Sequence, residues 1–263
     1  MTKYLEISHM PTIWCSGCGN GIVMNTMLRA FEEEALTPDN TVIVSGIGCS
    51  SRMPGYLTFP SVHTAHGRAI PFATGLKMAR PDLNIVIVSG DGDAAAIGGN
   101  HLIHACRRNL DLTLIIINNE TYGMTNGQFS PLTPIGSFSS TSEYGSIDRP
   151  FDVMKLCAAA GATYAARSSV YHTEQLKRFI SEGTRNHGFS VIECLSICPT
   201  HYGKDNGFSD PVEMMNFLRD NCTWMGKDGK RKKYCMDLGV FCGESAPEYS
   251  DEYAKMRDRV RLL

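Results

Sequence analysis

Two short polar motifs, Gly90-Asp91-Gly92 and Asn118-Asn119, are separated by 25 residues and together could hold a magnesium ion and a diphosphate. Each follows an apolar run, at residues 85–88 and 112–117, that predicts a buried parallel strand, and a helix is predicted between the runs over about residues 97–108. In such sheets, ligands bind outside the carboxyl ends of the strands. Carboxylate and carboxamide oxygens suit magnesium, and glycines let phosphates approach the backbone.

Each motif alone is typical of a turn or a polar loop. Together, at this spacing and each after a strand, they resemble the thiamine-diphosphate-binding motif of thiamine-dependent enzymes. A dinucleotide-binding fingerprint fits less well, because its third glycine and its acidic residue about 20 positions further on are not completed here.

The elements around these motifs alternate between strands and helices, which predicts one α/β domain with a parallel sheet flanked by helices. Further strands are predicted at 41–44 and 190–195, and further helices at about 21–34, 152–160, 173–182 and 252–263. A loop rich in Gly, Ser and Thr, residues 123–146, is long enough to be either functional or mobile. We expect residues 1–203 to form the cofactor domain, and 204–263 to be an extension for subunit or partner contacts.

Composition restricts the class of protein. With 263 residues, 43% of them apolar, the chain can bury one substantial core. A formal net charge of −2 argues against nucleic-acid binding through bulk charge. No apolar run is long enough to span a bilayer, and the first residues lack the apolar segment of a signal peptide, which favours a cytoplasmic protein.

Four of the ten cysteines are placed where they could share a metal centre. Cys15 and Cys18 form a Cys-x-x-Cys pair, Cys49 lies in a turn after the strand at 41–44, and Cys198 follows the last predicted strand. Four thiolates suit a cubane iron–sulfur cluster, whereas zinc sites more often show two Cys-x-x-Cys pairs. Spacing alone leaves iron–sulfur, zinc and no metal open.

The remaining six cysteines have no tight spacing. Cys106, Cys157 and Cys194 are interpreted as small apolar core residues. Cys222, Cys235 and Cys242 have no assigned role, and the basic segment from Lys227 to Lys233 is interpreted as a solvated loop.

In this order along the chain, these motifs resemble the β subunit of 2-oxoacid:ferredoxin oxidoreductases. The segments that carry the resemblance are Trp14 to Asn20, Gly46 to Ser51, His66 to Ala69, Gly90 to Asp93, Asn118 to Gln128 and Cys198 to Thr200. The resemblance implies thiamine diphosphate, Mg²⁺ and a [4Fe–4S] cluster as cofactors. It implies oxidative decarboxylation of a 2-oxoacid, acyl transfer to coenzyme A and single electrons passed to ferredoxin.

The resemblance also implies roles for individual residues. Magnesium would be held by Asp91, Asn119 and the backbone carbonyl of Thr121, and the cluster by Cys15, Cys18, Cys49 and Cys198. Residues expected to contact thiamine diphosphate are Ile47, Gly48, Cys49, Ser50, His66, Gly92, Asp93, Gly123 and Met124. Arg52 is a candidate partner for a substrate carboxylate, because arginine binds carboxylates through two parallel hydrogen bonds.

The chain has no second α/β domain to supply the glutamate that activates the aminopyrimidine ring. We therefore expect a partner α subunit to provide it, in a hetero-oligomer such as (αβ)₂. Residues Cys198 to Lys204 resemble 2-oxoglutarate enzymes more than pyruvate enzymes, although pyruvate or branched-chain 2-oxoacids stay open. A non-oxidative thiamine-dependent decarboxylase subunit and a zinc-stabilised binding subunit are the alternatives of a different class.

Overall fold

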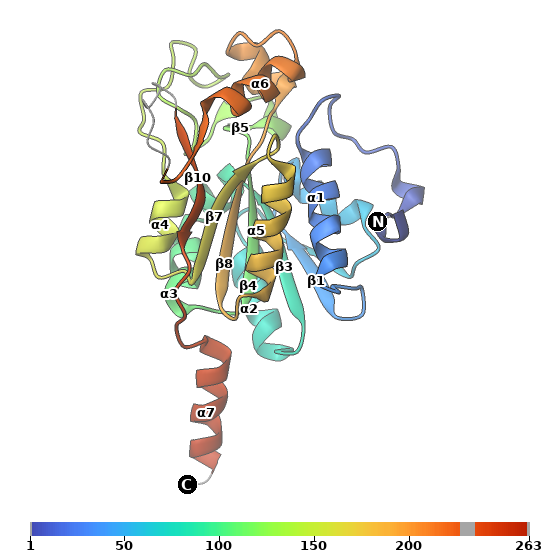
Figure 1. Ribbon diagram of the computed structural model, residues 1–263, viewed down its shortest axis with the longest axis vertical. Helices are drawn as coiled ribbons and strands as arrows, with labels where there is room; N and C mark the ends of the chain where they lie inside the picture. Colours follow the sequence, from blue (N-terminus) through green and yellow to red (C-terminus); the bar gives the residue numbers. More distant parts are fainter. Residues whose placement is uncertain (1, 227–234, 262–263) are drawn as a thin grey trace.

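The computed structural model describes residues 2–226 and 235–261. Most of the chain surrounds one eight-stranded sheet with helices on both faces (Figure 1). The strand order is β2-β1-β3-β4-β8-β7-β10-β9. The basic segment from Lys227 to Lys233 lies outside the described residues.

The centre of the sheet is parallel and consists of the four predicted strands together with two that were not predicted, Ser61–His63 and Tyr164–Ser169. The strands of this part are β2 (Ser61–His63), β1 (Thr41–Ser45), β3 (Asn84–Gly90), β4 (Leu112–Asn118), β8 (Phe189–Leu195) and β7 (Tyr164–Ser169). Alternate side chains of one strand enter different cores: Val86 packs on one face of the sheet and Ile87 on the other. Burial on both faces explains why these strands are apolar without alternation.

Two layers of helices cover the sheet (Figure 1). On one face, α1 (Asn20–Glu33) packs beside α5 (Thr173–Arg185), and both contribute apolar side chains to the same core. On the other face lie α2 (Ala69–Ala79), α3 (Gly99–Arg108) and α4 (Val153–Ala159). The helix expected from residue 97 begins at Gly99, after a π-helical turn, η4, over Asp93–Ile97.

The C-terminal part of the chain adds elements that the sequence did not predict. α6 (Pro211–Asn221) begins at a capping Asp210, whose side chain accepts from the Glu213 amide. β9 (Cys222–Trp224) and β10 (Met236–Cys242) follow, and β10 pairs antiparallel with β7. The sheet is therefore parallel except at this pair. Residues 204–263 share the sheet with the first 203, and the division between a cofactor domain and a contact segment stays a functional prediction.

The last helix, α7 (Tyr249–Arg261), confirms the helix expected at 252–263 and begins three residues earlier. None of the helices in the described part of the chain combines the length and apolar character needed to cross a membrane.

Candidate cofactor and metal site

The carboxyl ends of β1, β3 and β4 lie side by side because their registers bring them together. Gly90 at the end of β3 is paired with Ile117 in β4, and Ser45 at the end of β1 with Val88 in β3. The loops that follow enclose a cavity of about 90 Å³. Its lining includes Ile47, Gly48, Cys49, Ser50, His66, Asp91, Gly92, Asp93, Asn119, Thr121, Gly123 and Met124, together with Asn20, Tyr122 and Thr125.

Three oxygen-bearing groups converge at one corner of this cavity. When the Asn119 amide is turned so that its NH₂ group enters the corner, it donates to the Thr121 carbonyl oxygen at 2.9 Å and to Asp91 Oδ1 at 3.3 Å. Turned the other way, the same position holds the amide oxygen. Adjacent ligands of an octahedral Mg²⁺ ion are about 2.9 Å apart, given metal–oxygen distances near 2.1 Å. The distances from Asn119 to Thr121 and to Asp91 are therefore close to those between neighbouring ligands of one such cation.

The backbone between these ligands is held in an uncommon conformation. Glu120, between Asn119 and Thr121, has a φ of 60° in the left-handed region. Asn118 stabilises the turn, since its Oδ1 accepts from the Glu120 amide at 3.1 Å while its Nδ2 donates to Glu193 at 2.8 Å. This turn brings the Asn119 side chain and the Thr121 carbonyl to the same corner.

Asp91 is almost completely buried, with 2% of its surface exposed. Burial raises the pKa of its carboxyl to about 7, and the hydroxyl of Ser130, which donates to Oδ2 at 2.5 Å, opposes this shift. A buried carboxylate is costly unless a cation or donors offset its charge. A bound divalent cation would favour the ionised form.

Asp93 connects three segments around the cavity with its side chain. Its Oδ1 accepts from the amides of Gly67 (2.7 Å) and Ile47 (3.3 Å) and contacts Nδ1 of His66, while Oδ2 accepts from Ser89 Oγ at 2.6 Å. With Nδ1 of His66 engaged, Nε2 is left as the ring nitrogen for a ligand in the cavity. The carboxylate of Asp93 is thus occupied by protein donors, and it orients His66.

We expect Asp93→Ala to lower the free energy of unfolding by about 3 kcal/mol, because buried donors lose their acceptor. Chemical denaturation of the metal-free chain measures this effect. The control is Asp82→Ala, which removes an exposed partner of Arg80 and should change stability by no more than about 0.5 kcal/mol. Equal effects in the two variants would contradict the connecting role of Asp93.

At two motif positions, neighbouring side chains lie so close to the backbone that only glycine fits. A Cβ on Gly92 would lie 2.2 Å from the ring of Tyr122, and a Cβ on Gly46 would lie 2.1 Å from Asp93 Oδ2. Gly123 lies between the cavity and the cysteines: its Cβ would be 3.5 Å from the Cys198 sulfur and 3.7 Å from the Cys49 sulfur. The cavity and the cysteine group therefore adjoin.

The structure brings the four predicted cysteine ligands together. Repulsion from the other three thiols contributes to raising the pKa of Cys18 to about 11, although burial is the larger cause. Burial likewise raises the pKa of Cys49 and Cys198, with smaller contributions from neighbouring thiols of the group. A cationic metal centre would reverse these shifts.

The spacing of the four sulfurs bears on which kind of metal centre they could hold. Among the described residues, His187, Glu248 and Asp251 are the group of three whose potential metal-binding atoms all lie within 4.8 Å of one another. Within this described part, no three of the four cysteine sulfurs lie this close together. Around one zinc ion with Zn–S distances near 2.3 Å, the sulfurs would be about 3.8 Å apart. The four thiols are thus arranged more widely than one zinc ion requires.

The other sequence-predicted candidates lie elsewhere. Arg52 is exposed on the short helix η3 (Ser50–Tyr56) and does not line the cavity. Cys235 immediately precedes β10 and Cys242 ends it, about 23 Å away at the usual rise per residue, so Cys222, which pairs with Met236, cannot share one site with both. Cys106, Cys157 and Cys194 are buried in the core, as expected.

Several contributors to the site were not predicted. Asn20 lines the cavity with a buried Oδ1 that has no hydrogen-bond partner in the part of the chain that the structure describes, which fits a site completed by a ligand. Ser130 and Tyr122 come from the long loop and its start. Glu193, a charged residue inside a predicted buried strand, was the one visible signal, because such a charge needs a buried partner.

Comparison with known proteins places these residues in context. The sequence family described as thiamine pyrophosphate enzyme, C-terminal TPP binding domain, matches residues 46–194. The chain is 49% identical to 2-oxoglutarate synthase subunit KorB of Methanocaldococcus jannaschii, over 98% of this chain and 97% of that protein. It is 43% identical to 2-oxoglutarate oxidoreductase subunit KorB of Mycobacterium tuberculosis, over 71% of this chain and 50% of that one.

A solved structure is similar along nearly the whole chain. It is the 2-oxoglutarate:ferredoxin oxidoreductase from Magnetococcus marinus with 2-oxoglutarate, coenzyme A and succinyl-CoA bound. The match has a TM-score of 0.88 and 32% identity, and covers 98% of this chain and 90% of that chain.

Proposed function

Because this chain belongs to the β subunits of the 2-oxoglutarate:ferredoxin oxidoreductases, a family of thiamine pyrophosphate enzymes, we propose that it oxidises 2-oxoglutarate together with an α subunit. In the proposed reaction, 2-oxoglutarate and coenzyme A give succinyl-CoA, CO₂ and one proton, and two electrons leave singly for two ferredoxin centres. The main support for this proposal is that the four cysteines adjoin a cavity in which Asp91, Asn119 and the Thr121 carbonyl could hold Mg²⁺.

Each cofactor has a fitting set of residues. Asp91, Asn119 and the Thr121 carbonyl would hold Mg²⁺, and His66, oriented by Asp93, would bind a phosphate through Nε2. Thiamine diphosphate, when bound, supplies the electron sink for decarboxylation. The residues Ile47 to Ser50, Gly92, Gly123 and Met124 would position it against the protein.

A [4Fe–4S] cluster would be held by Cys15, Cys18, Cys49 and Cys198. When bound, such a cluster carries electrons one at a time. Cys49 lines the cavity and would also bind the cluster. Gly123, which has no side chain, lies between the cavity and the sulfurs of Cys49 and Cys198. This arrangement supports electron transfer rather than non-oxidative decarboxylation, which has no use for four thiols beside the cofactor.

The α subunit would supply the pyrimidine-side domain and the activating glutamate, in an (αβ)₂ assembly. The described residues contain one main eight-stranded sheet, and the loops at the carboxyl ends of β1, β3 and β4 carry the residues proposed to bind the diphosphate side of the cofactor. The complex would thus place the cofactor between the subunits. We further propose that ferredoxin accepts the electrons and that the complex acts in the cytoplasm.

The test is an anaerobic assay of the chain co-purified with its α subunit. We expect ferredoxin reduction that requires both 2-oxoglutarate and coenzyme A, a lower rate with pyruvate, and none with the chain alone. Turnover by the chain alone would show that the active site does not need residues of the α subunit. Release of CO₂ without electron transfer or coenzyme A dependence would identify a non-oxidative decarboxylase instead.

Arg52 is proposed to bind the substrate carboxylate at the subunit boundary, which agrees with its exposure in the chain alone. Loss of a charged hydrogen bond costs about 1.5–3 kcal/mol, so Arg52→Gln should raise the KM for 2-oxoglutarate by roughly 10- to 150-fold. Steady-state kinetics of the complex measure this change, with Arg80→Gln as an exposed control. An unchanged KM would remove Arg52 from the substrate site.

A further inference from the structure

Helix α7 projects from the body of the protein at the end opposite α6 (Figure 1). It spans Tyr249–Arg261, about 20 Å at the usual rise per residue, and none of its residues is buried. A helix of this length is marginal in water without packing. A contact outside this chain would stabilise it.

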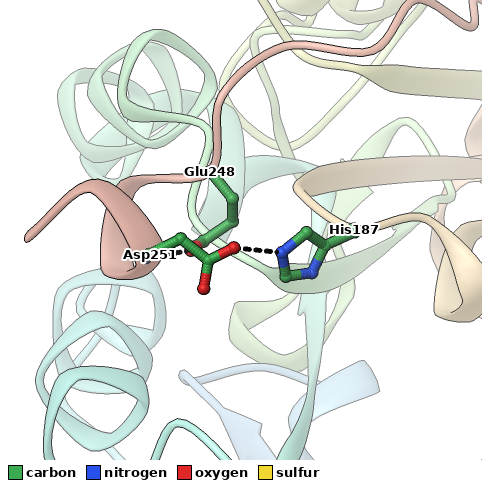
Figure 2. Close-up of side chains that lie close together, drawn as sticks. All are labelled: His187, Glu248 and Asp251. Carbon is green, nitrogen blue, oxygen red and sulfur yellow. Dashed lines mark hydrogen bonds and ion pairs between the residues drawn. The ribbon is translucent and has the colours of Figure 1, made fainter. Parts of the chain in front are cut away.

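The base of α7 is fixed to the body. Glu248, 3% exposed, accepts from the Asp111 amide at 2.9 Å through one oxygen and from the Asp251 amide at 2.8 Å through the other. His187 Nε2 pairs with Asp251 at 2.8 Å (Figure 2). These bonds engage Nε2 of His187, both carboxylate oxygens of Glu248 and Oδ2 of Asp251, which are the atoms that could otherwise bind a metal. The group therefore serves as a helix cap and an ion pair. The direction of α7 is thereby set.

The exposed apolar residues of α7 form one stripe. Tyr249, Tyr253, Met256 and Val260 follow one another at intervals of four, three and four residues and are 40%, 44%, 46% and 62% exposed. This is the alternation of a and d positions in a two-helix coiled coil. The stripe is therefore built to pack against another helix.

The charges of α7 are divided between its halves. The first turn carries Asp251 and Glu252, while the last turns carry Arg257, Arg259 and Arg261 with one acid, Asp258. Glu252 pairs with Lys255 at 2.7 Å within the helix. Among the described residues, Arg259 and Arg261 have no ion-pair partner. An identical helix running antiparallel would place its basic half against the acidic half of this one.

We propose that α7 pairs antiparallel with α7 of a second copy of this chain. Packing Tyr253 against Met256 of the other copy sets Glu252 opposite the Arg259 of that copy, and two-fold symmetry repeats the pair. A parallel pair would instead set Glu252 near Arg257 and would bring acidic halves together.

The position of α7 favours a second copy over the α subunit. α7 is anchored to residues that precede β4 and β8, at the amino ends of the strands, whereas the cavity lies at the carboxyl ends. A subunit that completes the cavity therefore covers the opposite edge of the sheet. The inference does not depend on the proposed reaction.

Sedimentation equilibrium of the full chain over a range of concentrations tests this proposal. We expect a reversible dimer, because the helix is short, and at least a tenfold increase in its dissociation constant in Tyr253→Glu and Met256→Glu. Asp258→Ser, on the outer face of the helix, should leave the constant unchanged. Since α7 has no buried side chains, these variants should retain the thermal unfolding of the parent chain.

Charge exchange tests the orientation. Arg259→Glu should weaken the dimer at least fivefold and Arg257→Glu less, and Glu252→Arg combined with Arg259→Glu should restore it. A larger effect of Arg257→Glu would overturn the antiparallel arrangement. A monomer at every concentration, a dimer insensitive to the stripe, or stripe variants that lose the α subunit instead would overturn the proposal.

Discussion

Replacing Asp91 with asparagine is expected to abolish thiamine-diphosphate binding in the presence of Mg²⁺ and to reduce the activity of the αβ complex by more than a hundredfold. Even partners behind a metal ligand cost about 10- to 100-fold when they are removed, and Asp91 would be the one charged ligand at the corner it shares with Asn119 and Thr121. Isothermal titration calorimetry measures cofactor binding, and ferredoxin reduction measures activity.

The same variant separates a binding role from a folding role. The Asp91 carboxyl is buried and its pKa is raised to about 7. Because the ionised form is costly there without a cation, Asp91→Asn should leave the metal-free chain as stable as the parent or more stable. Asp82→Asn, an exposed change, is the control. Normal cofactor binding by Asp91→Asn would exclude the magnesium corner.

Replacing Cys18 with alanine is expected to remove the iron–sulfur cluster. The parent chain, purified without oxygen, should contain about four irons and four acid-labile sulfides, the composition of a cubane. In Cys18→Ala both should fall to near zero, and ferredoxin reduction should fall to background. Thiamine-diphosphate binding should persist, since Cys18 does not line the cavity.

Cys222→Ala is a matched control for this variant. Both thiols are half-buried, and burial raises the pKa of Cys18 to about 11 and that of Cys222 to about 12. Loss of iron in Cys222→Ala with retention in Cys18→Ala would place the cluster elsewhere. Zinc in the parent chain would reject the electron-transfer role and leave a zinc-stabilised subunit.

The strands that carry the motifs were predictable because burial on both faces demands continuous apolar runs. Val86 and Ile87 show this, since they enter opposite cores. The approximate position of Asp91 beside Asn119 followed, because parallel strands end at one edge. The confirmed α/β fold thus rests on a strong local pattern.

β7 and β10 were missed because tertiary contacts stabilise them against their local sequence. Arg167, in the middle of β7, is buried through pairs with Glu193 at 2.6 Å and Asp152 at 2.7 Å, which lie 26 and 15 residues away in the sequence. β10 contains Gly239 at a φ of 135°, an unfavourable residue for a strand interior. Ser130 was equally hidden, since it reaches Asp91 from a loop 39 residues away.

The order of the strands has a consequence for the synthesis of the protein. β7 leaves the ribosome well before β10, and until β10 docks, β7 presents an edge strand with free backbone groups to other chains. Such an edge is a template for aggregation. In the finished sheet both outermost strands, β2 and β9, have only three residues, which leaves few unpaired groups. The segment after α6 covers the edge of β7 in the folded chain, and its pairing would limit contact between newly made chains.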